Sequence, residues 1–161
     1  MPRTALLLGS LIALAIGLTA CAAEPEPEPE WTEESAYAEA EEVFRAYWNV
    51  DFDGDIPKKL MTPSMAAAEE EGREELANSG VEFRGVSEIT SVKHVSYRTV
   101  GESAVVTLQA CIDASELEMR GSDGQWRQPR TESTYGVEAQ LESRAENMLV
   151  ADMSEPEGIE C

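Results

Sequence analysis

The segment AVVTLQACIDAS, residues Ala104–Ser115, decides the fold. Apolar residues occupy every second position from Ala104 to Ile112, and the intervening positions from Val105 to Asp113 are mostly polar. Side chains on a strand alternate between its two faces, so this pattern predicts a strand over residues 104–113 with one face against a core.

Weaker alternation continues on both sides of this segment. The pattern in Ile89–Val100 is broken, which allows one long or bulged strand, while Thr131–Arg144 alternates clearly. Shorter strands are expected at Glu116–Arg120 and Met148–Met153. Turn-forming residues separate the segments, at 101–102, 121–124 and 146–147. The second half of the chain therefore predicts an antiparallel sheet.

The part before residue 81 has helical periodicity instead. A first helix is expected from Thr32, with an apolar stripe along one side formed by Tyr37, Ala40, Phe44, Tyr47 and Trp48. A short helix is expected at Ile56–Met61, and a third from Pro63 or Ser64 to Asn78, stopped by Gly80. Its weak apolar face is expected at Met65, Ala68, Gly72 and Leu76. The order predicts an α+β fold with N-terminal helices packed on a curved antiparallel sheet.

This order of elements, with the segments Ala104–Ser115 and RTESTYGVEAQL (Arg130–Leu141), resembles the nuclear transport factor 2-like (SnoaL-like) cone. More narrowly, the chain resembles small actinobacterial lipoproteins that carry such a domain. The resemblance implies one cone-like domain over residues 32–161, with a pocket between helices and sheet. Some members of that superfamily are isomerases, dehydratases or epoxide hydrolases, and many only bind or scaffold.

The first 21 residues have the layout of an export signal. Arg3 precedes an apolar run from Ala5 to Leu18, and Leu18–Cys21 resembles the lipobox of bacterial lipoproteins. The resemblance implies that residues 1–20 are a signal peptide and that Cys21 carries lipid. Residues 21–31 contain alternating Pro and Glu, which favours an extended spacer. We expect a lipid-anchored protein on the extracytoplasmic face of the bacterial cell membrane.

The charge balance narrows the class of partner. The formal net charge is −20, with 32 acidic and 12 basic side chains among 161 residues. Nucleic-acid binding needs clustered Lys and Arg, so this composition argues against it. Anionic head groups are repelled as well, so membrane attachment is expected only through the lipid on Cys21.

Two cysteines remain besides the predicted lipid site. In an exported domain, Cys111 and Cys161 are expected to form a disulfide, and the alternative is a pair of free thiols. Closing a loop of about 50 residues contributes on the order of 4 kcal/mol in the chain-entropy model. The bridge would also hold the polar tail from Ser154 to Cys161 against a strand.

Catalytic and metal-binding candidates are few. Pocket enzymes of the nuclear transport factor 2-like fold, which this chain resembles, use a buried Asp or His. The candidates here are Asp113, His94 and the hydroxyl of Tyr97. By simple alternation His94 shares a face with Val92 and Ser96. Each candidate also has a plain structural interpretation: Asp113 would order a turn, His94 would be a surface residue, and Tyr97 would pack with its hydroxyl in water.

Asp51, Asp53 and Asp55 are spaced like the start of a calcium loop. An EF-hand loop starting at Asp51 would need Gly and Glu where the chain has Ile56 and Thr62. An acidic turn is the alternative interpretation. No motif for a bound cofactor occurs, so we expect none.

One local basic and aromatic patch, Trp126–Arg130, could contact an acidic partner, or its arginines could pair with neighbouring carboxylates. The sequence favours a non-catalytic binding or interaction module whose protein or small-molecule partner it does not identify. The alternative is a small pocket enzyme doing acid–base chemistry with Asp113 and His94. A structural envelope component is a third hypothesis.

Overall fold

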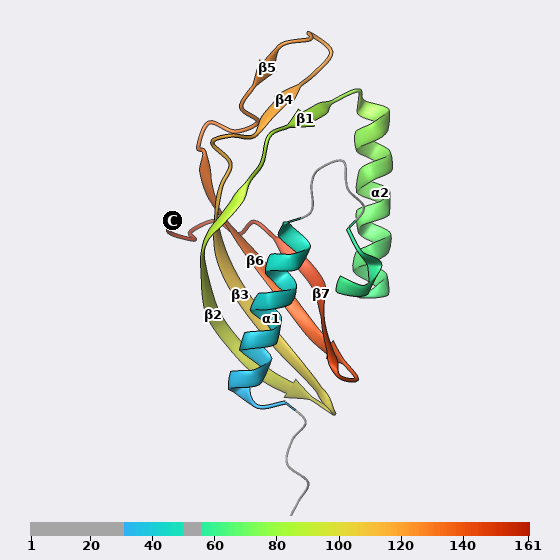
Figure 1. Ribbon diagram of the computed structural model, residues 1–161, viewed down its shortest axis with the longest axis vertical. Helices are drawn as coiled ribbons and strands as arrows, with labels where there is room; N and C mark the ends of the chain where they lie inside the picture. Colours follow the sequence, from blue (N-terminus) through green and yellow to red (C-terminus); the bar gives the residue numbers. More distant parts are fainter. Residues whose placement is uncertain (1–30, 50–55) are drawn as a thin grey trace, which may run out of the picture.

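The computed structural model describes residues 31–49 and 56–161 and has an α+β architecture in which helices cover one face of an antiparallel sheet (Figure 1). This confirms the fold class predicted from the sequence. The main sheet has the strand order β2-β3-β6-β7. Its strands are β2 (Glu88–Val100), β3 (Ser103–Asp113), β6 (Thr134–Arg144) and β7 (Asn147–Ser154).

Strand β3 is the centre of the core, as its alternation predicts. The residues of its inner face are buried: Ala104, Val106, Leu108, Ala110 and Ile112. Four of them face a partner on β6: Val106 pairs with Leu141, Leu108 with Ala139, Ala110 with Val137 and Ile112 with Tyr135. Close packing of these apolar side chains against α1 excludes water from this face of the sheet.

The edge strand β2 contains two irregularities. Its register shifts between Ile89 and Ser91 and again between His94 and Ser96. An extra residue in a strand reverses the side-chain alternation that follows it. Tyr97, and not Ser96, therefore lies on the inner face with His94. The expectation that His94 and Ser96 share a face is wrong.

Helix α1 (Glu33–Trp48) crosses the inner face of the sheet (Figure 1). The Thr32 hydroxyl accepts a hydrogen bond from the Ser35 amide at 3.1 Å and caps the helix, as expected. Phe44 and Ala40 of the predicted stripe are fully buried. An isolated helix of this length is only marginally stable in water, so burial of this stripe against the sheet is what stabilises α1.

The next segment is less helical than expected. A single 3-10 turn, η1 (Lys58–Leu60), replaces the predicted helix over Ile56–Met61. Helix α2 (Pro63–Ser79) follows, capped by Thr62 and ended by Gly80 at φ 69°, close to its expected bounds. Thr62 also ties this region to the sheet, since its amide donates to the Val150 carbonyl at 2.9 Å.

A second, three-stranded sheet was not expected. It has the order β1-β4-β5 and forms a small layer at the end of the molecule opposite the start of α1 (Figure 1). Its strands are β1 (Glu82–Arg84), β4 (Glu118–Arg120) and β5 (Trp126–Arg127). The short strand expected at Glu116–Arg120 is present as β4. Strands β1 and β5, of three and two residues, show too little alternation to be identified from sequence.

The predicted disulfide is present. The sulfur atoms of Cys111 and Cys161 lie 2.12 Å apart, and the bridge joins residues separated by 50 positions. The tail also packs on the outer face of β6: a Cβ placed on Gly136 would lie 2.4 Å from Ile159 Cβ. The outer face of the sheet is therefore partly covered by the end of the chain.

Among residues 31–49 and 56–161, no helix is both long enough and apolar enough to cross a membrane.

Candidate ligand-binding site

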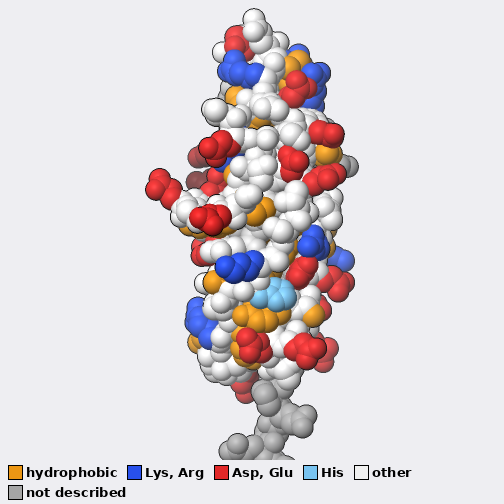
Figure 2. Space-filling view, turned by 90° about the vertical axis from the view of Figure 1, so that its left-hand side faces the viewer, with side chains coloured by type: hydrophobic (Ala, Val, Ile, Leu, Met, Phe, Trp, Pro, Cys, Tyr) orange, Lys and Arg blue, Asp and Glu red, His pale blue; other side chains and the backbone are white. Residues whose placement is uncertain are grey.

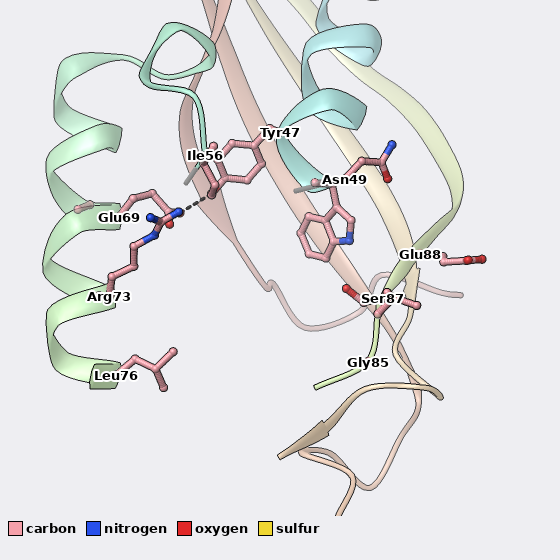
Figure 3. A pocket seen from close by; sticks show the side chains of 13 residues that line it. Tyr47, Asn49, Ile56, Glu69, Arg73, Leu76, Gly85, Ser87 and Glu88 are labelled. Atoms are coloured by element: carbon pink, nitrogen blue, oxygen red, sulfur yellow. Dashed lines mark hydrogen bonds between the residues drawn. The ribbon is translucent and has the colours of Figure 1, made fainter. Parts of the chain in front are cut away.

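A cavity of about 570 Å³ lies between the C-terminal end of α1, helix α2 and the segment that links β1 to β2 (Figure 3). This volume falls within the usual range of small-molecule sites. Thirteen described residues line it: Tyr47, Trp48, Asn49, Ile56, Ala68, Glu69, Gly72, Arg73, Leu76, Gly85, Val86, Ser87 and Glu88.

The α1 side of the cavity is aromatic. Tyr47 and Trp48 are the last two residues of the helix: Tyr47 belongs to the buried core, Trp48 packs against it, and both line the cavity. The Phe44 ring packs at 6.0 Å from the Trp48 ring and holds it in place. Trp48 Nε1 is buried and has no hydrogen-bond partner in the described part of the chain. Aromatic residues therefore extend from the core directly into the cavity.

A polar group lies on the opposite wall. The Tyr47 hydroxyl donates a hydrogen bond to Glu69 of α2. Burial raises the pKa of the Tyr47 phenol well above its usual value, and the neighbouring Glu69 carboxylate adds to this effect. Arg73, one turn further along α2, extends along the same wall (Figure 3). The cavity thus combines apolar surface with one hydrogen-bonding cluster, as ligand sites commonly do.

Helix α2 forms one wall without burying any of its own residues. Its more enclosed positions are Met65, Ala66, Glu69 and Arg73, so the inward face is rotated from the one expected at Ala68, Gly72 and Leu76. Those three residues line the cavity instead, and Leu76 is 36% exposed. The apolar row of α2 therefore faces open space and not a packed core.

The third wall depends on a glycine. Gly85 has φ 90°, and a Cβ there would lie 2.0 Å from the Glu116 carbonyl oxygen. Only glycine allows the chain to pass so close to this backbone in that conformation. This close approach places the next residue, Val86, in the lining of the cavity, where it is 45% exposed.

The candidate His94 lies at a different place, on the inner side of edge strand β2. Its ring stacks on Tyr37 with centroids 4.3 Å apart, and its Nε2 lies 3.2 Å from Glu41 Oε2. It is the one histidine of the chain, pale blue and exposed beside apolar side chains in Figure 2. Although burial acts in the opposite direction, hydrogen bonds from Arg45 and His94 hold the pKa of Glu41 below its ordinary value. His94 connects β2 to α1 and does not line the cavity.

Asp113 lies on the other face of the sheet. Its carboxylate accepts a hydrogen bond from the Ser115 amide at 2.8 Å, which orders the turn after β3 and lowers the pKa of Asp113. Asp113 and His94 are thus separated by the sheet. Tyr97 donates its hydroxyl to the Trp31 carbonyl at 2.8 Å, near the start of α1. The structure does not bring these three candidates into one site.

The predicted lipid site and the predicted calcium ligands lie outside the described residues: Cys21, Asp51, Asp53 and Asp55. Within the described ranges, no three His, Cys, Asp or Glu side chains are grouped to hold a metal ion.

The basic patch at 126–130 is internally paired. Arg127 binds Asp123 and Arg130 binds Glu155, each at 2.6 Å, as the second interpretation of this patch predicts. Arg84 and Arg120 stack on Trp126, with distances of 4.2 and 4.8 Å to the ring centroid. These interactions organise the small sheet and leave no cluster of unpaired arginines there.

The resemblance implies a pocket between helices and sheet, but the sequence does not show which residues line the cavity. Tyr47 and Trp48 fit the helical stripe, which predicts a core position, while Glu69 lies in an acidic run with no distinguishing pattern. The one available signal was the weakness of the apolar face of α2. A helix with so little apolar surface cannot pack closely against a core.

No protein-family model matches the chain, and the comparison with curated proteins found no match. Among solved structures, the intermembrane space region of the chloroplast protein ARC6 superposes with a TM-score of 0.46 and 11% sequence identity, over 76% of this chain and 92% of that chain.

Proposed function

We propose that this protein is a lipid-anchored, extracytoplasmic binding module whose ligand occupies the cavity between α1, α2 and residues 85–88. The observation that carries this proposal is the cavity itself: about 570 Å³, with aromatic and aliphatic walls and the Tyr47–Glu69 pair at one side. A ligand with an apolar body and a polar group would match both surfaces.

The position of the cavity supports tethered binding. Figure 1 shows the start of α1 at one end of the molecule and the small sheet at the other. The cavity is lined by the last residues of α1, and a 16-residue helix spans about 24 Å. An anchor at Cys21 precedes the start of α1 in sequence, so it would leave the cavity at the far end of that helix.

The acid–base alternative gains no support from the geometry. It needs Asp113 or His94 beside a bound substrate, and neither residue lines the cavity. The Asp113 carboxylate is already engaged by the turn that it orders. The resemblance to the nuclear transport factor 2-like cone remains a proposal about ancestry and carries no reaction with it.

Binding of a neutral apolar fluorophore, N-phenyl-1-naphthylamine, to the purified full chain tests the cavity. Gly72 lines it, and a Cβ there would meet no atom of residues 31–49 and 56–161 within 4 Å. We expect Gly72→Leu to fill the space and to weaken probe binding about 10-fold or more, because the side chain takes the ligand's place. Equilibrium fluorescence titration measures the affinity.

The matched control is Gly72→Ala. Both substitutions remove a helix-interior glycine and so stabilise α2 by up to about 1 kcal/mol. Alanine adds only one carbon, so probe affinity should change less than about twofold. Lipid on the anchor contributes equally in all variants. Equal binding by Gly72→Leu and the unaltered chain would contradict the proposal, and a structural envelope role would then be favoured.

The anchor is tested separately with Cys21→Ser. Loss of the thiol removes the attachment point of the lipid, so we expect the protein to leave the membrane fraction or to stay unprocessed while its fold is unchanged. Fractionation, with mass spectrometry of the mature N-terminus, measures both effects. A variant that stays membrane-bound after processing, or a mature protein that does not begin at a lipidated Cys21, would show that the anchor is wrong.

A further inference from the structure

We infer that the cavity is a docking groove for a basic amphipathic helix of a partner protein. This inference rests on the proposed binding function and identifies the chemistry of its ligand. Three features support it: the shape of the α2 wall, the acidic residues beside it and the charge of the whole chain.

The α2 wall has the form of a helix-docking surface. Ala68, Gly72 and Leu76 repeat every fourth residue, so they form one row along the helix, about 12 Å long. Small residues in such a row allow another backbone to approach closely, and no atom of the described residues lies within 4 Å of a Cβ placed on Gly72. Trp48 and Val86 supply apolar surface across the groove. Two turns of an incoming helix would fit this length with anchors at positions i and i+7.

A second row of α2 is acidic and runs beside the first. Glu71 and Glu75 follow Ala68 and Gly72 by three positions, so each neighbours a residue of the apolar row. Both are exposed, and neither makes an ion pair with any described residue. Glu88 also lines the cavity, across from α2, but its side chain points away from it (Figure 3). Carboxylates along the α2 side of an apolar groove complement a helix whose apolar stripe is bordered by Lys or Arg on that side.

The charge distribution also excludes the simplest alternative occupant. A second copy of this chain would bring another α2, which carries five glutamates, Glu69, Glu70, Glu71, Glu74 and Glu75, against Arg73 alone. Like charges placed face to face are destabilising, and the net charge of −20 adds to the repulsion. The same field attracts a cationic partner and speeds its association at low salt.

An 18-residue peptide of leucine and lysine, with leucines at i, i+3, i+4 and i+7, is the probe for this groove. We expect the purified full chain to bind it and not to bind the same peptide with glutamate in place of lysine. The double variant Glu71→Gln/Glu75→Gln should weaken binding about 3- to 10-fold at low salt and reduce its salt dependence. Gly72→Leu should weaken it about 10-fold or more, because the groove is filled.

The matched control removes two charges elsewhere. Glu102 and Glu146 are exposed residues in the turns between β2 and β3 and between β6 and β7. Glu102→Gln/Glu146→Gln removes the same two negative charges. If it weakened peptide binding as much as the α2 double variant does, the attraction would be non-specific and the inference would be overturned. The inference would also be overturned if the glutamate peptide bound, or if Gly72→Leu did not weaken binding of the lysine peptide.

The two proposals fail differently. If N-phenyl-1-naphthylamine binds and responds to Gly72→Leu but the lysine peptide does not bind, the helix-docking inference is wrong and the cavity is a small-molecule site. If neither probe binds, both proposals are wrong.

Discussion

Replacing Cys161 with Ser is expected to lower the free energy of unfolding by on the order of 4 kcal/mol, because the bridge closes a loop of about 50 residues in the unfolded chain. Cys161 is exposed and joins no core cluster, so its removal takes away little packing. Urea or thermal unfolding should show the loss, with a fall in melting temperature on the order of 10–15 °C.

The unaltered protein with and without reductant is the control. The reduced protein and Cys161→Ser should unfold at the same midpoint, and reductant should have no further effect on the variant. Cys111→Ser should match both. A Cys161→Ser variant as stable as the oxidised protein would contradict this account of the tail, in which the bridge holds Cys161 to β3.

Phe44→Ala is expected to lower the free energy of unfolding by about 3–5 kcal/mol, because it leaves a cavity in a packed core. Phe44 is fully buried where α1 meets the inner face of the sheet. Its ring also packs on Trp48, so the aromatic wall of the ligand cavity should loosen as well. Chemical unfolding measures the first effect, and the titration with N-phenyl-1-naphthylamine measures the second.

Val100→Ala is the matched control for core packing. Val100 is 54% exposed at the end of β2, so its truncation should change the free energy of unfolding by less than about 1 kcal/mol. Comparable losses from Phe44→Ala and Val100→Ala would mean that α1 is not packed on the sheet as described.

The main elements follow from the sequence because each carries a strong local signal. Strand β3 alternates over its whole length, α1 has both a cap at Thr32 and a continuous apolar stripe, and α2 has Thr62, Pro63 and Gly80 at its ends. These signals depend on neighbouring residues, and tertiary contacts agree with them. The fold class could therefore be predicted from single-sequence patterns.

The candidate site could not be predicted in the same way. It is a space between segments distant in sequence, and its polar pair joins Tyr47 to Glu69 across 22 positions. Two irregularities in β2 also change which residues share a face, so His94 could not be placed by alternation. The predicted candidates Asp113 and His94 were chosen for their chemistry, and chemistry alone does not decide which side of a sheet a residue occupies.

Backbone chemical-shift mapping of the full chain, titrated with N-phenyl-1-naphthylamine, tests the central claim most directly. If the probe occupies the cavity, the largest shifts should occur in residues 47–49, 68–76 and 85–88, with little change in β4 and β5. Largest shifts on the outer face of the main sheet or in the small sheet, or no shifts at saturating probe, would contradict the account.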